Sequence, residues 1–307
     1  MEPLIFNCFK PARMSSYDII REFKRNIPKK DLGKIGHFGT LDPFACGVLL
    51  IGVSGAQKLN NLIHDDLTKT YLAIGKLGVD YDTGDMTGIC TQTDDSDYFN
   101  KEIPQFSKDF IQSQLEEKFL GTYWQAPHKF SAAKYEGKKL YEYAREGVEI
   151  KKAKKERFVH KIEVVKYAFP YLSIRFEVSS GTYIRTLFSD CAQYLGTLGT
   201  LVSLVRESIG DMNIHNSIPY KGLPGKESFS KDLGMTPDEA YPAQKYTLND
   251  KLAAHFVNGV QLSLTQFDYK FDATKKYWLY NEKNELLGLA NIENEKIKSQ
   301  FIFSFNS

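Results

Sequence analysis

Five side chains in this sequence could carry out chemistry on a ligand: one carboxylate, one imidazole, two phenols and one guanidinium. The carboxylate, Asp42, lies in a glycine-punctuated stretch at residues 36–47 that leads directly into an apolar run. An aspartate that acts without a metal or a Ser–His pair is best suited to be a nucleophile or to stabilise a charge. An arginine beside such a carboxylate lowers its pKa and orients its oxygens. The candidates are His37, Asp42, Tyr71, Tyr183 and Arg185.

Two other interpretations of Asp42 stay open from the residues alone. Asp is common in turns, where it only accepts hydrogen bonds from nearby backbone N–H groups. A glycosidase would need a second carboxylate as its acid, and the acidic loop at 80–85 could provide one. That loop departs from the EF-hand calcium pattern, because Thr91 stands where a Glu is required. We therefore expect the loop to form Asx-type turns that anchor a basic group.

The expected secondary structure places Asp42 and Tyr71 on rigid supports. An apolar run at 48–53 predicts a buried strand after the Asp42 loop, and Pro43 favours an extended conformation at Asp42. Alternation over residues 69–77 predicts a strand that carries Tyr71. A stiff loop beside a core strand is where a scaffold tends to present catalytic groups.

Arg185 falls in the first turn of a helix that should end near residue 195. The helix dipole favours an acid at that position, so we expect Arg185 to have a role other than helix support.

In the helix expected at 107–120, the apolar spacing predicts that Phe110 is buried. The remaining expected elements are strands at 4–9, 157–169, 171–178 and 199–206, and helices at 17–26, 55–63 and 138–145.

Length and composition favour a folded chain of two domains. The sequence has 307 residues, of which 42% are hydrophobic, enough for a packed core. We expect one domain at residues 1–240 and a small, mostly β domain at 241–307. The start of the sequence lacks a signal-peptide pattern and the apolar runs are too short to span a bilayer, so we expect a cytoplasmic protein. The cysteines show no metal-ligand spacing, and no metal site is expected: Cys8, Cys46, Cys90 and Cys191.

Basic residues gather in two runs although the formal net charge is only +2. One run covers residues 21–34 and the other residues 129–157, and both contain aromatic side chains. Basic groups interleaved with aromatics suit a phosphate backbone with stacked bases, although an ordinary solvated face has the same composition. The irregular, basic stretch at about 125–155 is interpreted as a flap over a ligand.

The loop that carries Asp42 resembles the signature of the TruB-type tRNA pseudouridine synthases, GHxGTLDPxAxGVL. Four further segments match family motifs in the same order, at residues 9–16, 69–85, 125–145 and 181–185, so the resemblance spans roughly residues 4–210. Phe38 replaces the small polar residue usual beside His37, and Cys46 takes the usual Thr position.

The resemblance implies an α+β fold, in which helices flank a mixed, mostly antiparallel central sheet and a small PUA-like β-rich RNA-binding domain follows. It implies an isomerase that flips the T-loop uridine 55 of tRNA and converts it to pseudouridine, without cofactor or metal. We also expect a monomer. The alternative is a non-catalytic tRNA-binding or folding factor of the same fold.

Residue roles follow from the same resemblance. Asp42 is expected to be the nucleophile, Arg185 to pair with it, and Tyr71 to stack on the flipped base and to be a candidate for proton abstraction. His37 is expected to fill space in the T loop, and Asp85 to provide a polar link to the site. The implied substrate-binding residues are His37, Lys69, Tyr71, Asp85, Tyr183 and Leu204.

Overall fold

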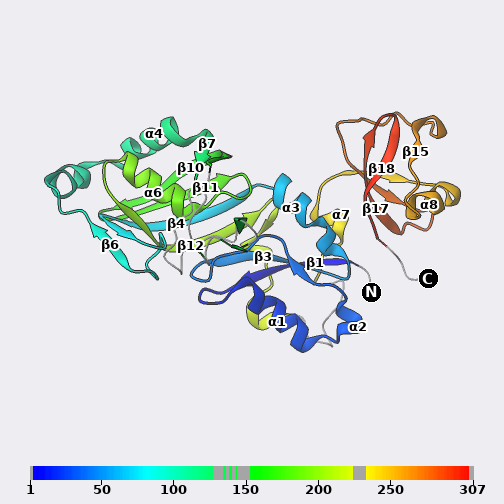
Figure 1. Ribbon diagram of the computed structural model, residues 1–307, viewed down its shortest axis with the longest axis horizontal. Helices are drawn as coiled ribbons and strands as arrows, with labels where there is room; N and C mark the ends of the chain where they lie inside the picture. Colours follow the sequence, from blue (N-terminus) through cyan, green and yellow to red (C-terminus); the bar gives the residue numbers. More distant parts are fainter. Residues whose placement is uncertain are drawn as a thin grey trace.

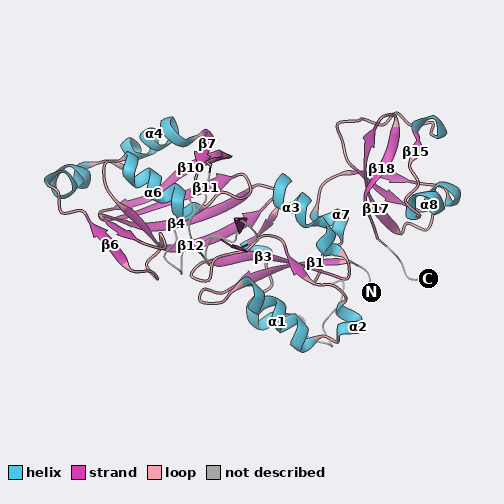
Figure 2. Ribbon diagram, in the orientation of Figure 1, coloured by secondary structure: helices cyan, strands magenta, loops and turns pink. Residues whose placement is uncertain are grey.

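A computed structural model describes residues 3–126, 134–135, 138–139, 143, 153–223 and 233–303. Seven strands of this part form the main path of a large sheet, and two short strands join it at its side (Figures 1 and 2). The order is β1 (Leu4–Lys10), β3 (Cys46–Val53), β12 (Gly199–Ile209), β4 (Lys69–Leu77), β11 (Tyr171–Val178), β10 (Lys155–Ala168) and β7 (Gly121–Gln125), with β2 (Gly36–His37) on β3 and β13 (Met212–Asn213) on β12.

Neighbouring strands of this sheet are antiparallel except for β3 and β12, which are parallel. The helices α4 (Lys108–Phe119) and α6 (Ile184–Tyr194) share one buried core with β4 and β10–β12. Around β1 and β3 a second core includes α1 (Ser16–Asn26) and α2 (Lys29–Leu32). The expected α+β architecture with a mixed, mostly antiparallel sheet is confirmed.

A second sheet of five strands lies in the C-terminal part of the chain, at the right of Figure 1. Between the two sheets lie the 3₁₀ turn η1 (Ala56–Leu59), α3 (Asn60–Asp66) and α7 (Pro237–Ala240), and α8 (Asp250–Val257) packs on the second sheet. The strand order of the second sheet is β14 (Gln244–Thr247), β16 (Tyr277–Tyr280), β17 (Leu286–Glu293), β18 (Lys296–Ile302) and β15 (Leu262–Ser263).

One apolar core is shared by the two sheets. Trp278, the largest fully buried side chain of the described residues, belongs to the same buried cluster as Ile5 and Leu59. Burial of apolar surface on both sides of this contact stabilises the docking of the second sheet. The division into domains at residues 1–240 and 241–307 stays a prediction.

Smaller elements complete the fold. The hairpin β5 (Val79–Tyr81) with β6 (Cys90–Thr93) frames the acidic loop. Within the flap region the structure describes residues 125–126, 134–135, 138–139, 143 and 153–155. Two short strands lie there, β8 (Lys134–Tyr135) and β9 (Lys138–Lys139), so a helix that begins at residue 138 is wrong. Short helical turns are η2 (Tyr98–Glu102), η3 (Ile103–Gln105), η4 (Ile214–Asn216), η5 (Tyr220–Gly222) and η6 (Leu264–Gln266).

Local sequence explains the elements that carry the site. Strand β4 alternates between buried and half-buried residues along its whole length, as a half-covered strand should. Ser15 and Asp18 form a reciprocal capping box at the start of α1. The prediction for Phe110 is wrong: its side chain is 43% exposed and packs against the ring of Phe106 at the surface, with 4.7 Å between ring centroids.

Candidate active site

A cavity of about 270 Å³ brings together most of the residues singled out from the sequence. It lies where the loop between β2 and β3 meets strands β4 and β12 and the start of α6. Asp42, Tyr71 and Arg185 all line it, together with Tyr183, Leu204 and Lys69. The other lining residues are Gly39, Thr40, Leu41, His64, Gly181, Thr182, Ile184 and Arg206.

Arg185 and Asp42 form an ion pair in this cavity. The Nε of Arg185 lies 3.0 Å from Oδ2 of Asp42. The arginine side chain is only 7% exposed, whereas that of Asp42 is 36% exposed. The guanidinium therefore holds the carboxylate from behind and leaves part of it open to the cavity.

The acidic loop fixes the other end of the guanidinium. Nη1 of Arg185 donates to the carbonyl oxygen of Thr83 at 2.7 Å and lies 3.4 Å from Oδ2 of Asp85. Asp85 is itself buried, and its Oδ1 accepts from the backbone N–H of Thr87 at 3.0 Å. The expectation that this loop anchors a basic group is confirmed, and Arg185 is that group.

Opposing effects set the pKa of the Asp42 carboxyl. Burial raises the pKa of Asp42 above its ordinary value, and the nearby Asp85 carboxylate adds to this, while Arg185 opposes it. The expected lowering effect of Arg185 is confirmed, but burial of the carboxylate in a partly closed cavity outweighs it. A carboxylate that is weakly solvated and has a raised pKa is a better nucleophile than a fully hydrated one.

Arg206 shapes the loop in front of Asp42. Its side chain is 1% exposed, and its Nε and Nη2 donate to the carbonyl oxygens of Val48 at 2.7 Å and Gly39 at 3.2 Å. Gly47 has φ +114°, and a Cβ there would lie 2.2 Å from the Arg206 carbonyl oxygen. Glycine is therefore required where the loop enters β3.

The N-terminal segment holds the same loop from the opposite side. The hydroxyl of Ser16 accepts from the N–H of Leu41 at 2.9 Å, directly before Asp42. Lys10 is fully buried, and its Nζ donates to the carbonyl oxygen of Ala45 at 2.6 Å. Burial lowers the pKa of this lysine to about 8. The backbone on both sides of Asp42 is thus fixed by buried polar side chains.

Strand register places Tyr71 and Leu204 on the same wall. Tyr71 on β4 lies opposite Arg206 on β12, and Ala73 lies opposite Leu204. Residues two apart on a strand share a face, so these four side chains point to one side of the sheet. The phenol ring of Tyr71 and the apolar side chain of Leu204 therefore form a surface on which a planar base can stack.

Tyr183 is fixed through its backbone by Gln125. Oε1 of Gln125 accepts from the N–H of Tyr183 at 2.8 Å, and Nε2 donates to the carbonyl oxygen of the same residue at 2.9 Å. Gln125 is 2% exposed and ends strand β7, where the flap begins. Gln125 therefore connects the start of the flap region to Tyr183 on the wall of the cavity.

Two residues expected in the substrate-binding set do not line the cavity: His37 and Asp85. Asp85 contacts Arg185 instead, as described above. His37 is half-buried on β2, and burial lowers its pKa, with Arg206 adding to this effect. The neighbouring Phe38 is fully buried, and its ring packs against Gly52 in the core.

His64 and Lys69 form a part of the cavity wall in which only Lys69 was expected from the sequence motifs. Lys69 is buried, and its Nζ donates to Ser180 Oγ at 2.9 Å and to the carbonyl oxygen of His64 at 3.2 Å. Burial lowers the pKa of Lys69 to about 7, with Arg206 adding to this effect. His64 was not expected at the site, because no motif includes it and only the fold brings α3 to the cavity.

Within the described ranges, no three His, Cys, Asp or Glu side chains lie together in the way that a metal site requires. No helix in the described part of the chain is long and apolar enough to cross a membrane.

Comparison with solved structures identifies the same fold in chains of two multi-component complexes. A chain from a Cbf5–Nop10–Gar1 complex superimposes with a TM-score of 0.69 at 20% sequence identity, covering 98% of this chain and 85% of that chain. A chain from an H/ACA ribonucleoprotein bound to a substrate RNA containing 2′-deoxyuridine gives a TM-score of 0.67 at 19% identity, with the same coverage. At these identities the likeness concerns the fold.

Sequence relatives are closer. Proteins named tRNA pseudouridine synthase B are 31% identical in Clostridium acetobutylicum, over 96% of this chain and 97% of the relative, and 33% identical in Clostridium kluyveri, over 97% and 99%. The relative from Thermotoga maritima is 33% identical over 94% of this chain and 90% of its own length. A family model described as the N-terminal domain of the TruB family pseudouridylate synthases matches residues 24–184. The chain therefore belongs to the TruB family of pseudouridine synthases.

Proposed function

We propose that this protein converts the T-loop uridine at position 55 of tRNA to pseudouridine, with Asp42 as the nucleophile. The observation that supports this most directly is the Asp42–Arg185 ion pair, in which the buried arginine leaves the carboxylate accessible from the cavity. The full-length similarity to proteins named tRNA pseudouridine synthase B gives the substrate class.

In the proposed reaction an oxygen of Asp42 attacks the ribose or the uracil ring, and the C–N glycosidic bond breaks. The uracil then turns so that its C5 faces the ribose C1′, the new C–C bond forms, and the bond to the Asp42 oxygen breaks, which releases the carboxylate. The proton on C5 is lost and N1 gains one, so that substrate and product contain the same atoms. Tyr71 is our candidate for the removal of the C5 proton, since its ring lies on the wall beside Leu204.

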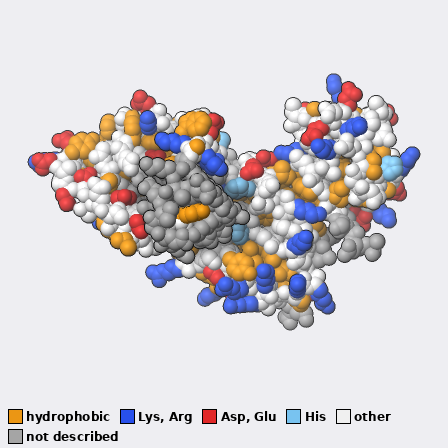
Figure 3. Space-filling view, viewed as in Figure 1, with side chains coloured by type: hydrophobic (Ala, Val, Ile, Leu, Met, Phe, Trp, Pro, Cys, Tyr) orange, Lys and Arg blue, Asp and Glu red, His pale blue; other side chains and the backbone are white. Residues whose placement is uncertain are grey.

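The uridine has to leave the base stack of the T loop before its glycosidic bond can be reached. The surface around α1 and α2 can bind the RNA backbone, because its basic side chains are exposed and gather there, at the lower part of Figure 3. We further propose that residues 241–307 form a PUA-like RNA-binding domain. The exposed basic residues at α1 and α2 are Arg21, Lys24, Arg25, Lys29, Lys30 and Lys34.

Two other functions make different predictions. A two-acid glycosidase would need a second carboxylate in the cavity, and among the described lining residues Asp42 is the acidic one, while Asp85 lies behind Arg185. A non-catalytic RNA-binding factor would have no reason to hold a desolvated carboxylate open to the cavity. Both arrangements favour the isomerase.

The test uses the purified chain and an unmodified tRNA transcript, without added cofactor. Pseudouridine is mapped by chemical derivatisation and primer extension, and a transcript with cytidine at position 55 serves as the control. We expect one modified position in the first transcript and none in the second. Release of free uracil would support the glycosidase, and tRNA binding without any modified nucleotide would support the RNA-binding factor.

A further inference from the structure

Two clusters of the same composition join the helices α3 and α7 to residues in or next to the second sheet. In each cluster one aspartate accepts hydrogen bonds from a tyrosine hydroxyl and a lysine ammonium. The first consists of Asp66, Tyr241 and Lys276, and the second of Asp238, Tyr280 and Lys245. Both lie beside the buried core around Trp278, to which Tyr241 and Tyr280 belong.

The first cluster is centred on Asp66, the last residue of α3. Its Oδ2 accepts from the hydroxyl of Tyr241 and from Nζ of Lys276, at 2.7 Å from the latter. The ammonium also lies 2.9 Å from the Tyr241 hydroxyl, so the three groups contact one another in a closed triangle. Hydrogen bonds to charged partners are about twice as strong as neutral ones.

The helix α3 connects this cluster to the active site. His64, two residues before Asp66, lines the cavity that holds Asp42. Side chains two apart on a helix do not face each other, so His64 can point to the cavity while Asp66 points to the second sheet. The carbonyl oxygens of His64 and Leu67 hold the buried ammonium of Lys69, another lining residue.

We propose that Asp66 is a positioning residue for catalysis: by fixing the end of α3 to Tyr241 and Lys276, it sets the His64–Lys69 wall of the active-site cavity. The second sheet then contributes to the reaction through this contact as well as through any RNA that it binds. A wall that shifts by a fraction of an ångström changes how the flipped nucleotide is aligned with Asp42. This inference rests on the proposed function for its kinetic consequence.

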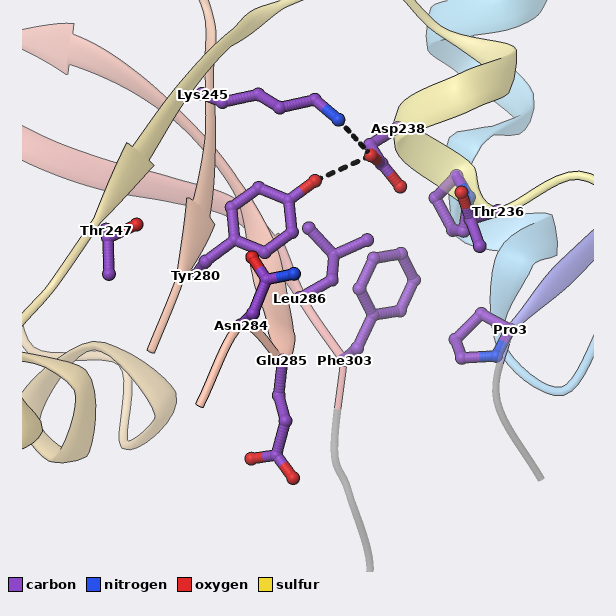
Figure 4. A pocket seen from close by; sticks show the side chains of 11 residues that line it. Pro3, Thr236, Asp238, Lys245, Thr247, Tyr280, Asn284, Glu285, Leu286 and Phe303 are labelled. Atoms are coloured by element: carbon purple, nitrogen blue, oxygen red, sulfur yellow. Dashed lines mark hydrogen bonds and ion pairs between the residues drawn. The ribbon is translucent and has the colours of Figure 1, made fainter. Parts of the chain in front are cut away.

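The second cluster is a matched control within the same protein. Asp238 on α7 accepts from Nζ of Lys245 and from the hydroxyl of Tyr280, each at 2.6 Å (Figure 4). It borders a different cavity, of about 440 Å³, between α7 and the second sheet. No residue of α7 lines the cavity that contains Asp42. Loss of this cluster therefore weakens a contact of the same chemistry without touching the active-site wall.

The experiment compares Asp66→Asn with Asp238→Asn in the full chain. Each substitution keeps the shape of the side chain and removes its charge. The readouts are thermal unfolding, the dissociation constant for a tRNA transcript, the single-turnover rate at saturating enzyme, and hydrogen exchange at residues 60–69. Lys276→Met removes the cluster from the other side and serves as the second variant if Asp66→Asn does not fold.

We expect both asparagine variants to unfold at lower temperature and to bind tRNA within about 3-fold of the wild type. Asp66→Asn and Lys276→Met should each slow the single-turnover rate by about 10-fold or more and speed hydrogen exchange at residues 60–69. Asp238→Asn should do neither. Combining Asp66→Asn with Lys276→Met should add little to either single change. Equal rates and equal exchange for the Asp66 and Asp238 variants would overturn the positioning role. A wild type that forms no pseudouridine would count against the proposed function, and the exchange data would then still decide whether Asp66 holds α3.

Discussion

Arg185 contacts two carboxylates of different accessibility: its Nε lies 3.0 Å from Asp42, which is open to the cavity, and its Nη1 lies 3.4 Å from Asp85, which is buried. One guanidinium thus links the loop after β5 to the loop before β3. The arginine fork can do this because its donors point in fixed, different directions. Because of this arrangement, we expect substitutions of Asp42 and of Asp85 to affect the reaction differently.

Arg185→Lys should abolish this double contact while keeping the positive charge. A single ammonium at that place cannot reach both Asp42 and the Thr83 carbonyl on the far side of the guanidinium. Loss of one hydrogen bond to a charged group costs about 1.5–3 kcal/mol, so the single-turnover rate should fall roughly 10- to 100-fold. Arg175→Lys is the control, because Arg175 binds Glu207 and Glu163 outside the cavity; a rate loss as large in that variant would contradict the assignment.

Asp85→Asn should shift the pH dependence of the reaction. The charge of Asp85 helps to raise the pKa of Asp42, and its removal also leaves Arg185 more fully to Asp42. Both effects lower the pKa of Asp42, so the carboxylate stays ionised to lower pH. The acidic limb of the single-turnover rate should therefore move to lower pH than in the wild type. A limb that moves to higher pH would show that another group titrates there.

Gln125→Ala should separate stability from activity when it is compared with Gln112→Ala. Both glutamines make two hydrogen bonds to the main chain: Gln125 to Tyr183, and Gln112 to Ile162 and Val164 of β10. Each loss should destabilise the fold by about 1–3 kcal/mol. Only Gln125→Ala frees a residue of the cavity, so only this variant should also lower the rate, measured at a temperature where both variants are folded. Equal rates in the two variants would remove Gln125 from the site.

Lys69→Met should reveal the low pKa of this buried ammonium in the stability of the protein. The folded-state pKa of Lys69 is about 7, well below the ordinary lysine value of 10.5. At a pH between these two pKa values the unfolded chain binds more protons than the folded one. The contribution of Lys69 to the free energy of unfolding therefore grows as pH rises and is lost as pH falls through about 7. The wild-type free energy of unfolding, relative to Lys69→Met, should rise by up to about 1.4 kcal/mol per pH unit between pH 7 and 9. A flat difference, measured by denaturant titration, would contradict this pKa.

Much of the fold could be predicted from the sequence because its elements have clear local signals. The alternation over residues 69–77 predicted β4 correctly, and the helix expected at 17–26 is present as α1. Phe110 was misplaced because helical periodicity marks an apolar stripe without saying where the covered surface ends. The docking of α3 and α7 against the second sheet depends on contacts between residues far apart in the chain, such as Asp66 and Lys276, and no local pattern indicates them.

The sequence indicated several residues of the candidate site, but not the burial of its carboxylate. Ordered motifs identified Asp42, Tyr71 and Arg185, and the fold brings them to one cavity. The sequence does not indicate that the pKa of Asp42 is raised, because desolvation depends on how closely the folded chain surrounds the carboxylate. His64 and Arg206 were missed because one lies outside every motif and the other looks like an ordinary residue of a strand.

Asp42→Asn provides the most direct test of the central claim, that this carboxylate attacks the substrate. The amide keeps the size of the side chain and can still accept a hydrogen bond from Arg185, but it is a far weaker nucleophile. With a tRNA transcript in a single-turnover assay, we predict no detectable pseudouridine at position 55, together with tRNA binding and thermal unfolding close to the wild type. Pseudouridine formation at the wild-type rate by Asp42→Asn would contradict the account.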